Sequence, residues 1–179
     1  MPRFDESQTT DDKELIDRFL GRKSRFPCRI MTRCPGGTPQ VIFTDPVHLE
    51  EGRWKPFPAF LWLVCPRLQR EVSKLEGEHF SKKALECLEN DEDLLKSYLS
   101  GQKSVAEWRT KLAMQRLPNG VPPDIQKVME ETNISGSHFI TSLKCLHSHV
   151  AQTLAFGQNP IGEMVLDQIG PCSPNLSCT

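Results

Sequence analysis

The chain has 179 residues, a formal net charge of −1 and a hydrophobic fraction of 37%, which suits one domain with a sizeable core. The near-zero charge and the pI near 6.5 exclude a general affinity for nucleic acid or anionic membranes, so the expected partner is an unknown small molecule or protein. The longest apolar run, Ala59 to Cys65, is too short to cross a bilayer, and the acidic, Thr-rich N-terminus lacks signal-peptide character, which predicts a cytoplasmic protein. Seven cysteines in that setting favour reduced thiols or metal ligands over a disulfide framework.

The first third of the chain predicts one helix followed by a small antiparallel sheet. Residues 1–11 are polar and predict a disordered tail, and Asp11-Asp12 then offers an N-cap for a short amphipathic helix that Gly21 ends. Two strand-like segments flank a run of turn formers and predict a hairpin, and a later apolar run predicts a third, buried strand. The three predicted strands are Cys28–Arg33, Gln40–Thr44 and Ala59–Val64, and the proline-containing stretch between the last two is predicted to be a loop.

The chain after the third strand is predicted to be mainly helical. Cys65 should cap a helix that starts at Pro66, and Asn159 should cap a last helix that starts at Pro160. The fold class is therefore α+β, with the small antiparallel sheet packed against a mainly α-helical remainder. No linker divides the chain, so residues 12–169 form a single domain and residues 170–179 a flexible tail.

The most informative chemistry lies in a helix predicted to begin after Gly136 and to include Ser142–Ala151. Cys145 and His149 are one turn apart at its flank, the spacing at which two side chains reach a common ion. His147 is rotated by about 160° from Cys145 into the apolar arc. It is therefore interpreted as a hydrogen-bonded core histidine or a residue that supports the ligands.

Two Cys-Pro pairs, at Cys34 and Cys65, each follow a predicted strand. In a three-stranded meander the first and third strands run the same way, so both cysteines should leave the sheet at the same end. A helix packed across that end would add Cys145 and His149 and complete a set of three thiolates and one imidazole. That set matches zinc or an iron–sulfur cluster in ligand type, although the short C-x₂₋₄-C spacing is absent.

Two other functions remain open at this stage. Cys65 at a helix N-terminus, or Cys34 beside Arg33, could act as a thiolate nucleophile with His149 as its base. The candidate catalytic residues are Cys65, His147 and His149. Alternatively the cysteines are structural, and the protein is an interaction or regulatory module. Glu71 and Glu76 on the helix after Cys65 are interpreted as surface charges.

The sequence contains five short motifs, which follow one another in this order: Thr32-Arg33-Cys34-Pro35-x-Gly37-x-Pro39, Pro56-Phe57-Pro58, Trp62-Leu63-x-Cys65-Pro66, Lys144-Cys145-Leu146-His147-x-His149-Val150-Ala151 and Asn159-Pro160-Ile161-Gly162. Together they resemble a bacterial family named domain of unknown function five hundred and one, over residues 28 to 165. The resemblance implies that the three motif cysteines belong with His147 and His149, framed by Pro39, Trp62 and Asn159. It implies no activity, and only a link to cell-division or envelope physiology. Within the motifs, Arg33, Lys144 and Asn159 are predicted to contact a bound cofactor.

Overall fold

The computed structural model describes residues 5, 8–117 and 119–172 and has the predicted α+β class. Its main sheet consists of β1 (Cys28–Arg33), β2 (Pro39–Thr44) and β5 (Leu61–Leu63), paired antiparallel in the order β1-β2-β5. The predicted three-stranded meander is therefore confirmed, since β1 and β5 flank β2 and run in the same direction.

A second hairpin occupies the stretch that was predicted to be a loop. Strands β3 (Val47–Glu50) and β4 (Arg53–Pro56) pair antiparallel, so the loop prediction is wrong. Both residues of the connecting turn, Glu51 and Gly52, have positive φ angles of 52° and 77°. Such a turn twists the strands in the direction a two-stranded ribbon prefers, and Glu-Gly here takes the place usually held by Asn-Gly or Asp-Gly.

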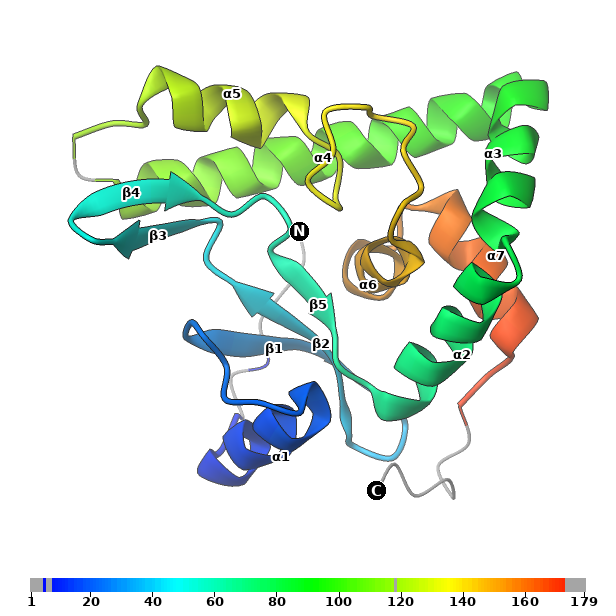
Figure 1. The fold of residues 1–179 in the computed structure, drawn as a ribbon, viewed down its shortest axis with the longest axis horizontal. Coiled ribbons are helices and arrows are strands. Elements are labelled where there is room, and N and C mark those ends of the chain that lie inside the picture. The colour runs from blue at the N-terminus through cyan, green and yellow to red at the C-terminus, as the bar shows by residue number, and fades with distance from the viewer. Residues whose placement is uncertain (1–4, 6–7, 118, 173–179) are drawn as a thin grey trace.

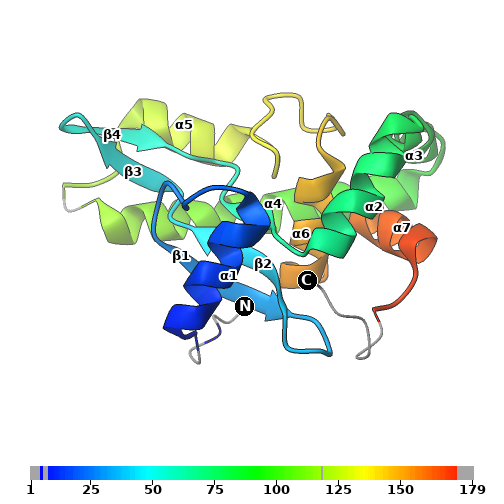
Figure 2. The same cartoon turned by 60° about the horizontal axis from the view of Figure 1, so that its bottom comes forward.

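Helix α1 (Thr10–Leu20) covers one face of the main sheet. Its N-cap is Thr9 rather than the predicted Asp11-Asp12, because the side chains of Thr9 and Asp12 bond each other's backbone N–H in a capping box. The helix packs Ile16 into a small cluster with Ile30, Ile42 and Val64. In Figures 1 and 2, α1 lies on one side of the sheet and the remaining helices lie on the other.

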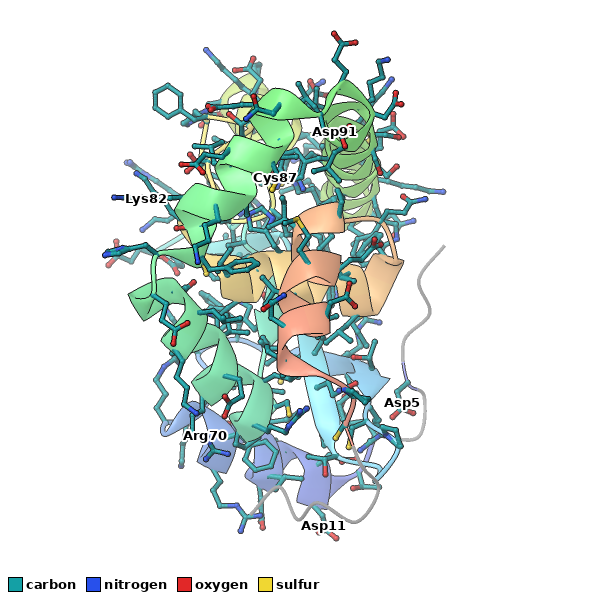
Figure 3. All side chains as sticks on the ribbon, turned by 90° about the vertical axis from the view of Figure 1, so that its right-hand side faces the viewer. Asp5, Asp11, Arg70, Lys82, Cys87 and Asp91 are labelled. Carbon is teal, nitrogen blue, oxygen red and sulfur yellow. The ribbon has the colours of Figure 1, made fainter. Side chains whose placement is uncertain are left out.

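Six further helices build the larger layer. They are α2 (Pro66–Gly77), α3 (Phe80–Asn90), α4 (Glu92–Arg116), α5 (Pro123–Glu131), α6 (Leu146–Phe156) and α7 (Pro160–Ile169). Figure 1 shows α6 end-on among the sheet, α2, α4 and α7, and Figure 3 looks onto α2, α3 and α7 from outside. The caps predicted at Cys65 and Asn159 are confirmed. The main core forms where α6 meets the sheet, through Val41, Leu61, Leu146 and Val150 among others.

Arg109 on α4 joins this helix to the end of α5 and to the chain before β5. Its guanidinium is fully buried and donates to the backbone carbonyls of Met129, Thr132, Asn133 and Pro58. Because a buried cation is costly unless its donors are satisfied, this network fixes α4 against α5 and the chain before β5. Part of α4 is thus interior.

One described residue of the N-terminal segment, Asp5, contacts the main sheet. Asp5 hydrogen-bonds to Ile30 and Arg33 on β1, within the region predicted to be a disordered tail. The predicted C-terminal tail lies outside the described residues beyond Cys172. Among the described helices, none has the length and apolar character needed to cross a bilayer.

Candidate metal centre

Helix α6 begins later than the sequence indicated, and this changes the site. Its first residue is Leu146 and Cys145 is the N-cap in an extended conformation, so the helix is present but its predicted start after Gly136 is wrong. Asn133 organises the preceding loop. Its side-chain amide donates to the carbonyls of Phe139, Ile140 and Ser142, while its oxygen accepts from the backbone of Ser135 and Ser137. An asparagine that satisfies five backbone groups competes directly with helix formation.

The geometry expected for Cys145 and His149 therefore does not arise. Cys145 lies outside the helical backbone, so the one-turn spacing no longer places both side chains on one flank. Phe139, which falls within the helix predicted to begin after Gly136, is instead 78% exposed in the loop. The partner of Cys145 is His147 instead.

Three potential ligands converge where α2 meets the start of α6. The sulfur of Cys145, a ring nitrogen of His147 and a carboxylate oxygen of Glu76 lie within 4.8 Å of one another. All three residues are partly exposed, with the side chains of His147 and Glu76 at 25% and 31% exposure. The site is therefore open to solvent while being anchored on two helices.

Glu76 is tied to the N-terminus of α6. The backbone N–H of Leu146 donates to Glu76 Oε1 over 2.7 Å, across 70 residues of sequence. The first N–H groups of a helix have no partner within the helix and carry partial positive charge, so a carboxylate is a favourable acceptor there. This bond holds Glu76 beside Cys145.

His147 is oriented by α2 on both sides of its ring. Nδ1 lies 3.3 Å from Glu76 Oε1, while Nε2 lies 3.2 Å from the carbonyl oxygen of Gln69 and 3.3 Å from Ser73 Oγ. A carbonyl only accepts, so Nε2 carries a proton and Nδ1 is left facing the cluster. His147 is thus a partly exposed residue among polar groups of α2, and its assignment to the apolar arc is wrong.

The electrostatics favour a thiolate beside an imidazolium. Burial raises the pKa of the Cys145 thiol, but hydrogen bonds from His147 and Ser148 outweigh it and lower the pKa overall. The interaction with Cys145, supported by the nearby Glu76 charge, raises the pKa of His147 to about 9. Ser148 Oγ also donates to Cys145 Sγ over 3.4 Å, which further satisfies the sulfur. The cluster is therefore polarised in a way that suits a cation or an electrophile.

His149 lies on the opposite, interior side of α6. Its side chain is fully buried, and Asn159 Nδ2 donates to its Nδ1 over 3.0 Å. Burial lowers the pKa of His149 to about 4, with a smaller opposing effect from the Ser142 backbone. Asn159 also donates to Gln152 and accepts from the N–H groups of Ile161 and Gly162. His149 and Asn159 thus join α6 to α7 inside the core.

Cys34 and Cys65 occupy the sheet end where β1 and β5 both terminate. Cys65 is fully buried at the N-cap of α2, and its backbone N–H faces the Gln40 carbonyl over 3.4 Å. Cys34 is 7% exposed in the turn after β1. Burial raises the pKa of the Cys34 thiol, but hydrogen bonds from the Thr38 and Gly36 backbone outweigh burial and lower the pKa overall.

Among the described residues, the trio of Glu76, Cys145 and His147 is the one group of three or more Cys, His, Asp or Glu side chains with ligand atoms this close. The structure therefore brings together Cys145 and His147 from the predicted set. It does not bring Cys34, Cys65 and His149 into that group.

The predicted cofactor contacts also occupy different environments. Arg33 pairs with Asp12 at 2.7 Å and with Asp5, so its guanidinium ties β1 to α1 and the N-terminal segment. Asn159 serves the buried network around His149. Lys144 is exposed and directly precedes Cys145, so of the three it is the one next to the cluster.

The family model for Protein of unknown function (DUF501) matches residues 30–167. The chain belongs to this family. No curated protein and no solved structure shows significant similarity to it. The match to DUF501 spans Glu76, Cys145 and His147, which places the whole cluster within the family domain.

Glu76 is the member of the cluster that the sequence reasoning missed. It was interpreted as surface charge because α2 carries several other acidic and basic residues. A signal was nevertheless present, since Gln69, Ser73 and Glu76 recur at helical spacing on one face while Leu68 and Val72 occupy the buried face. A polar stripe of that kind can hydrogen-bond to a neighbouring helix. That the neighbour is α6 follows only from the tertiary packing.

Proposed function

We propose that this DUF501 protein binds a zinc ion through Cys145 Sγ, His147 Nδ1 and Glu76, with a fourth coordination position open to water or substrate. The observation that carries the proposal is the convergence of the three ligand atoms within 4.8 Å. A tetrahedral zinc site needs donor atoms roughly 3.5 Å apart, given bond lengths of about 2.0 to 2.3 Å. The Nδ1 to Oε1 distance of 3.3 Å already meets that requirement.

The surroundings of the ligands support zinc further. A metal-bound histidine commonly donates its other N–H to a backbone carbonyl, and the Gln69 carbonyl takes that role for His147 Nε2. Leu146 N–H and Ser148 Oγ orient Glu76 and Cys145 in the same manner. Because these contacts fix each donor, little side-chain ordering is needed on binding.

The donor set also distinguishes between the metals that the sequence left open. One thiolate, one imidazole and one carboxylate suit zinc, whereas iron–sulfur clusters are held mainly by several thiolates. Three protein ligands with an open position are typical of catalytic zinc sites, while structural sites have four. The reaction supported by this arrangement is the activation of a bound water for attack on a polarised substrate, such as hydrolysis.

Zinc titration of the purified full chain tests the proposal. After chelator treatment, the wild type should bind one zinc per chain, and Cys145→Ser and His147→Ala should each weaken binding at least about 100-fold. Cobalt in place of zinc should give a thiolate charge-transfer band that Cys145→Ser removes. Cys87→Ser is the matched control, because Cys87 is an exposed thiol on α3, labelled in Figure 3, and should leave binding unchanged.

The outcomes separate this ligand set from the one predicted by sequence. If folded Cys65→Ser or Cys34→Ser abolishes zinc binding while Cys145→Ser and His147→Ala do not, the proposed ligands are wrong. An absence of stoichiometric zinc in the folded wild type would overturn the metal function altogether.

A second candidate function is nucleophilic catalysis by Cys145. The observation in its favour is the opposite pKa shifts of Cys145 and His147 at the N-terminus of α6, which resemble an activated thiolate–imidazolium pair. In the metal-free chain, Cys145 should be alkylated by iodoacetamide near neutral pH faster than the exposed Cys87. If Cys145 is slower than Cys87, the nucleophile function fails, and zinc protection of Cys145 would connect the two functions.

A further inference from the structure

A small cavity lies on the α1 side of the main sheet, away from the Cys145 cluster. It encloses about 130 Å³ between the end of α1, the chain leading into β1 and the outer face of β2 and β5. Figures 1 and 2 show α1 and α6 on opposite sides of this sheet, so the two sites are separated by the strands. Nothing in the proposed zinc function uses this cavity.

Aromatic rings form most of the walls. Phe26, Phe57 and Trp62 all line the cavity, and Phe26 meets Phe57 edge-on with ring centroids 5.5 Å apart. Phe57 and Trp62 lie nearly parallel, with centroids 6.1 Å apart and planes 19° apart. Flat walls of this kind accept a planar ring through stacked and edge contacts.

The walls are held in place by neighbouring groups. The outer face of Phe26 stacks on the buried His48 ring, with centroids 3.5 Å apart, and Trp62 Nε1 donates to the Ala59 carbonyl over 3.0 Å. Preformed walls reduce the ordering cost of binding. The cavity is therefore a rigid pocket rather than a gap between mobile side chains.

Two arginines give the pocket a positive rim. The guanidinium of Arg22 lies 5.5 Å from the Trp62 ring centroid, and that of Arg25 lies 5.1 Å from the Phe26 centroid. Arg25 also pairs with Glu50 at 2.8 Å, whereas Arg22 forms no ion pair with a described residue. Arg22 thus keeps donors and charge available for an anionic group at the pocket mouth.

The volume limits the ligand to one ring. The cavity of about 130 Å³ is slightly smaller than an apolar cavity of about 150 Å³ that is known to bind benzene, so it takes at most a single six-membered ring and excludes a fused pair. We propose that this pocket binds a small monocyclic aromatic anion, with the ring against the walls formed by Phe26, Phe57 and Trp62 and the carboxylate at Arg22. This inference is independent of the zinc site.

Benzoate is the probe for the test, titrated into the full chain and followed by the indole N–H resonance of Trp62, which Trp62→Phe identifies. A ligand of about nine heavy atoms is expected to bind with a dissociation constant on the order of 1 mM. We expect a saturable shift of that resonance, a loss of affinity of about fivefold in Arg22→Gln, and no change in Arg18→Gln, which removes an exposed charge of α1 outside the pocket.

Two further ligands separate the contributions of ring and charge. Cyclohexanecarboxylate, which is not planar, and acetate, which has no ring, should each bind at least about fivefold more weakly than benzoate. The proposal is overturned if benzoate gives no saturable shift at Trp62 up to ten times the expected constant, if acetate binds as well as benzoate, or if Arg22→Gln binds like the wild type.

Discussion

His147 and His149 are two residues apart on α6, and yet their environments shift the pKa of the imidazole in opposite directions. The pKa of His147 is raised to about 9, chiefly by Cys145, and the pKa of His149 is lowered to about 4 by burial. His147 faces the groove beside α2 among charged groups, whereas His149 points into the core toward Asn159 and Tyr98. Two positions apart on a helix is a rotation of about 200°, so one residue meets solvent and the other meets packed side chains.

The buried region around His149 contributes to the stability of the fold, whereas the exposed region around His147 carries the titratable groups of the candidate site. Around His149, the side chain of Asn159 hydrogen-bonds to His149 Nδ1 and Gln152, so removing Asn159 leaves these buried groups desolvated and unbonded. Around Cys145 and His147, the groups are partly exposed to solvent. Changes near His149 should therefore affect unfolding, and changes near His147 should affect zinc binding.

The largest expected effect comes from Asn159→Ala. Asn159 bonds His149, Gln152 and the first N–H groups of α7, so its loss should cost about 4 kcal/mol in the free energy of unfolding. Urea denaturation measures this loss. Asn90→Ala, at an exposed helix end, is the control and should cost less than about 0.5 kcal/mol. Equal effects of the two changes would contradict the importance of the buried network.

Acid should destabilise the chain through His149. In the unfolded chain a histidine takes up a proton near pH 6.5, whereas folded His149 resists protonation until about pH 4. The unfolded state therefore binds more protons between these values, so stability falls as the pH drops from about 6.5 to about 4, by about 3 kcal/mol. His48, whose pKa burial also lowers, contributes in the same direction.

Unfolding free energies at several pH values, combined with a nuclear magnetic resonance titration of the His149 ring, test this expectation. A His149 midpoint above 6 in the folded chain would show that its environment does not exclude the charged form.

Gly162→Ala should cost about 2 kcal/mol of stability by separating α6 from α7. An added Cβ would collide with Thr153 Oγ1 and the His149 carbonyl oxygen, which belongs to the backbone and cannot rotate away. Gly77→Ala is a matched control in a helix, because its Cβ would meet nothing within 4 Å. That change should be neutral or slightly stabilising. Thermal melting of both variants makes the comparison, and a neutral Gly162→Ala would contradict the close helix contact.

The smallest expected effect is that of Glu76→Gln on zinc affinity. An amide keeps the size of the side chain and can still accept from Leu146 N–H, but it is a poorer zinc ligand than a carboxylate. We expect a loss of about tenfold, or about 1.4 kcal/mol, with the unfolding free energy changed by less than about 1 kcal/mol. Glu78→Gln, two residues on and exposed, is the control for charge. A large loss of stability without a loss of zinc affinity would assign Glu76 a purely structural role.

Local rules predicted much of the fold correctly from the sequence. Alternation and turn residues identified the β1-β2 hairpin, and Cys65-Pro66 and Asn159-Pro160 marked the starts of α2 and α7. These features depend on neighbouring residues only. The β3-β4 hairpin was missed because its Glu-Gly turn lacks the usual asparagine or aspartate and prolines flank it.

What the sequence determined by itself is the α+β class, the positions of most helices and strands, and the presence of reactive residues around Cys145. The tertiary structure decided which of those residues meet. Asn133 draws the preceding loop away from helix, which makes Cys145 a cap, and the packing of α2 supplies Glu76 from 70 positions away. The physical reason is that helix starts follow from local hydrogen bonding, whereas a site depends on long-range packing, which sequence spacing does not encode.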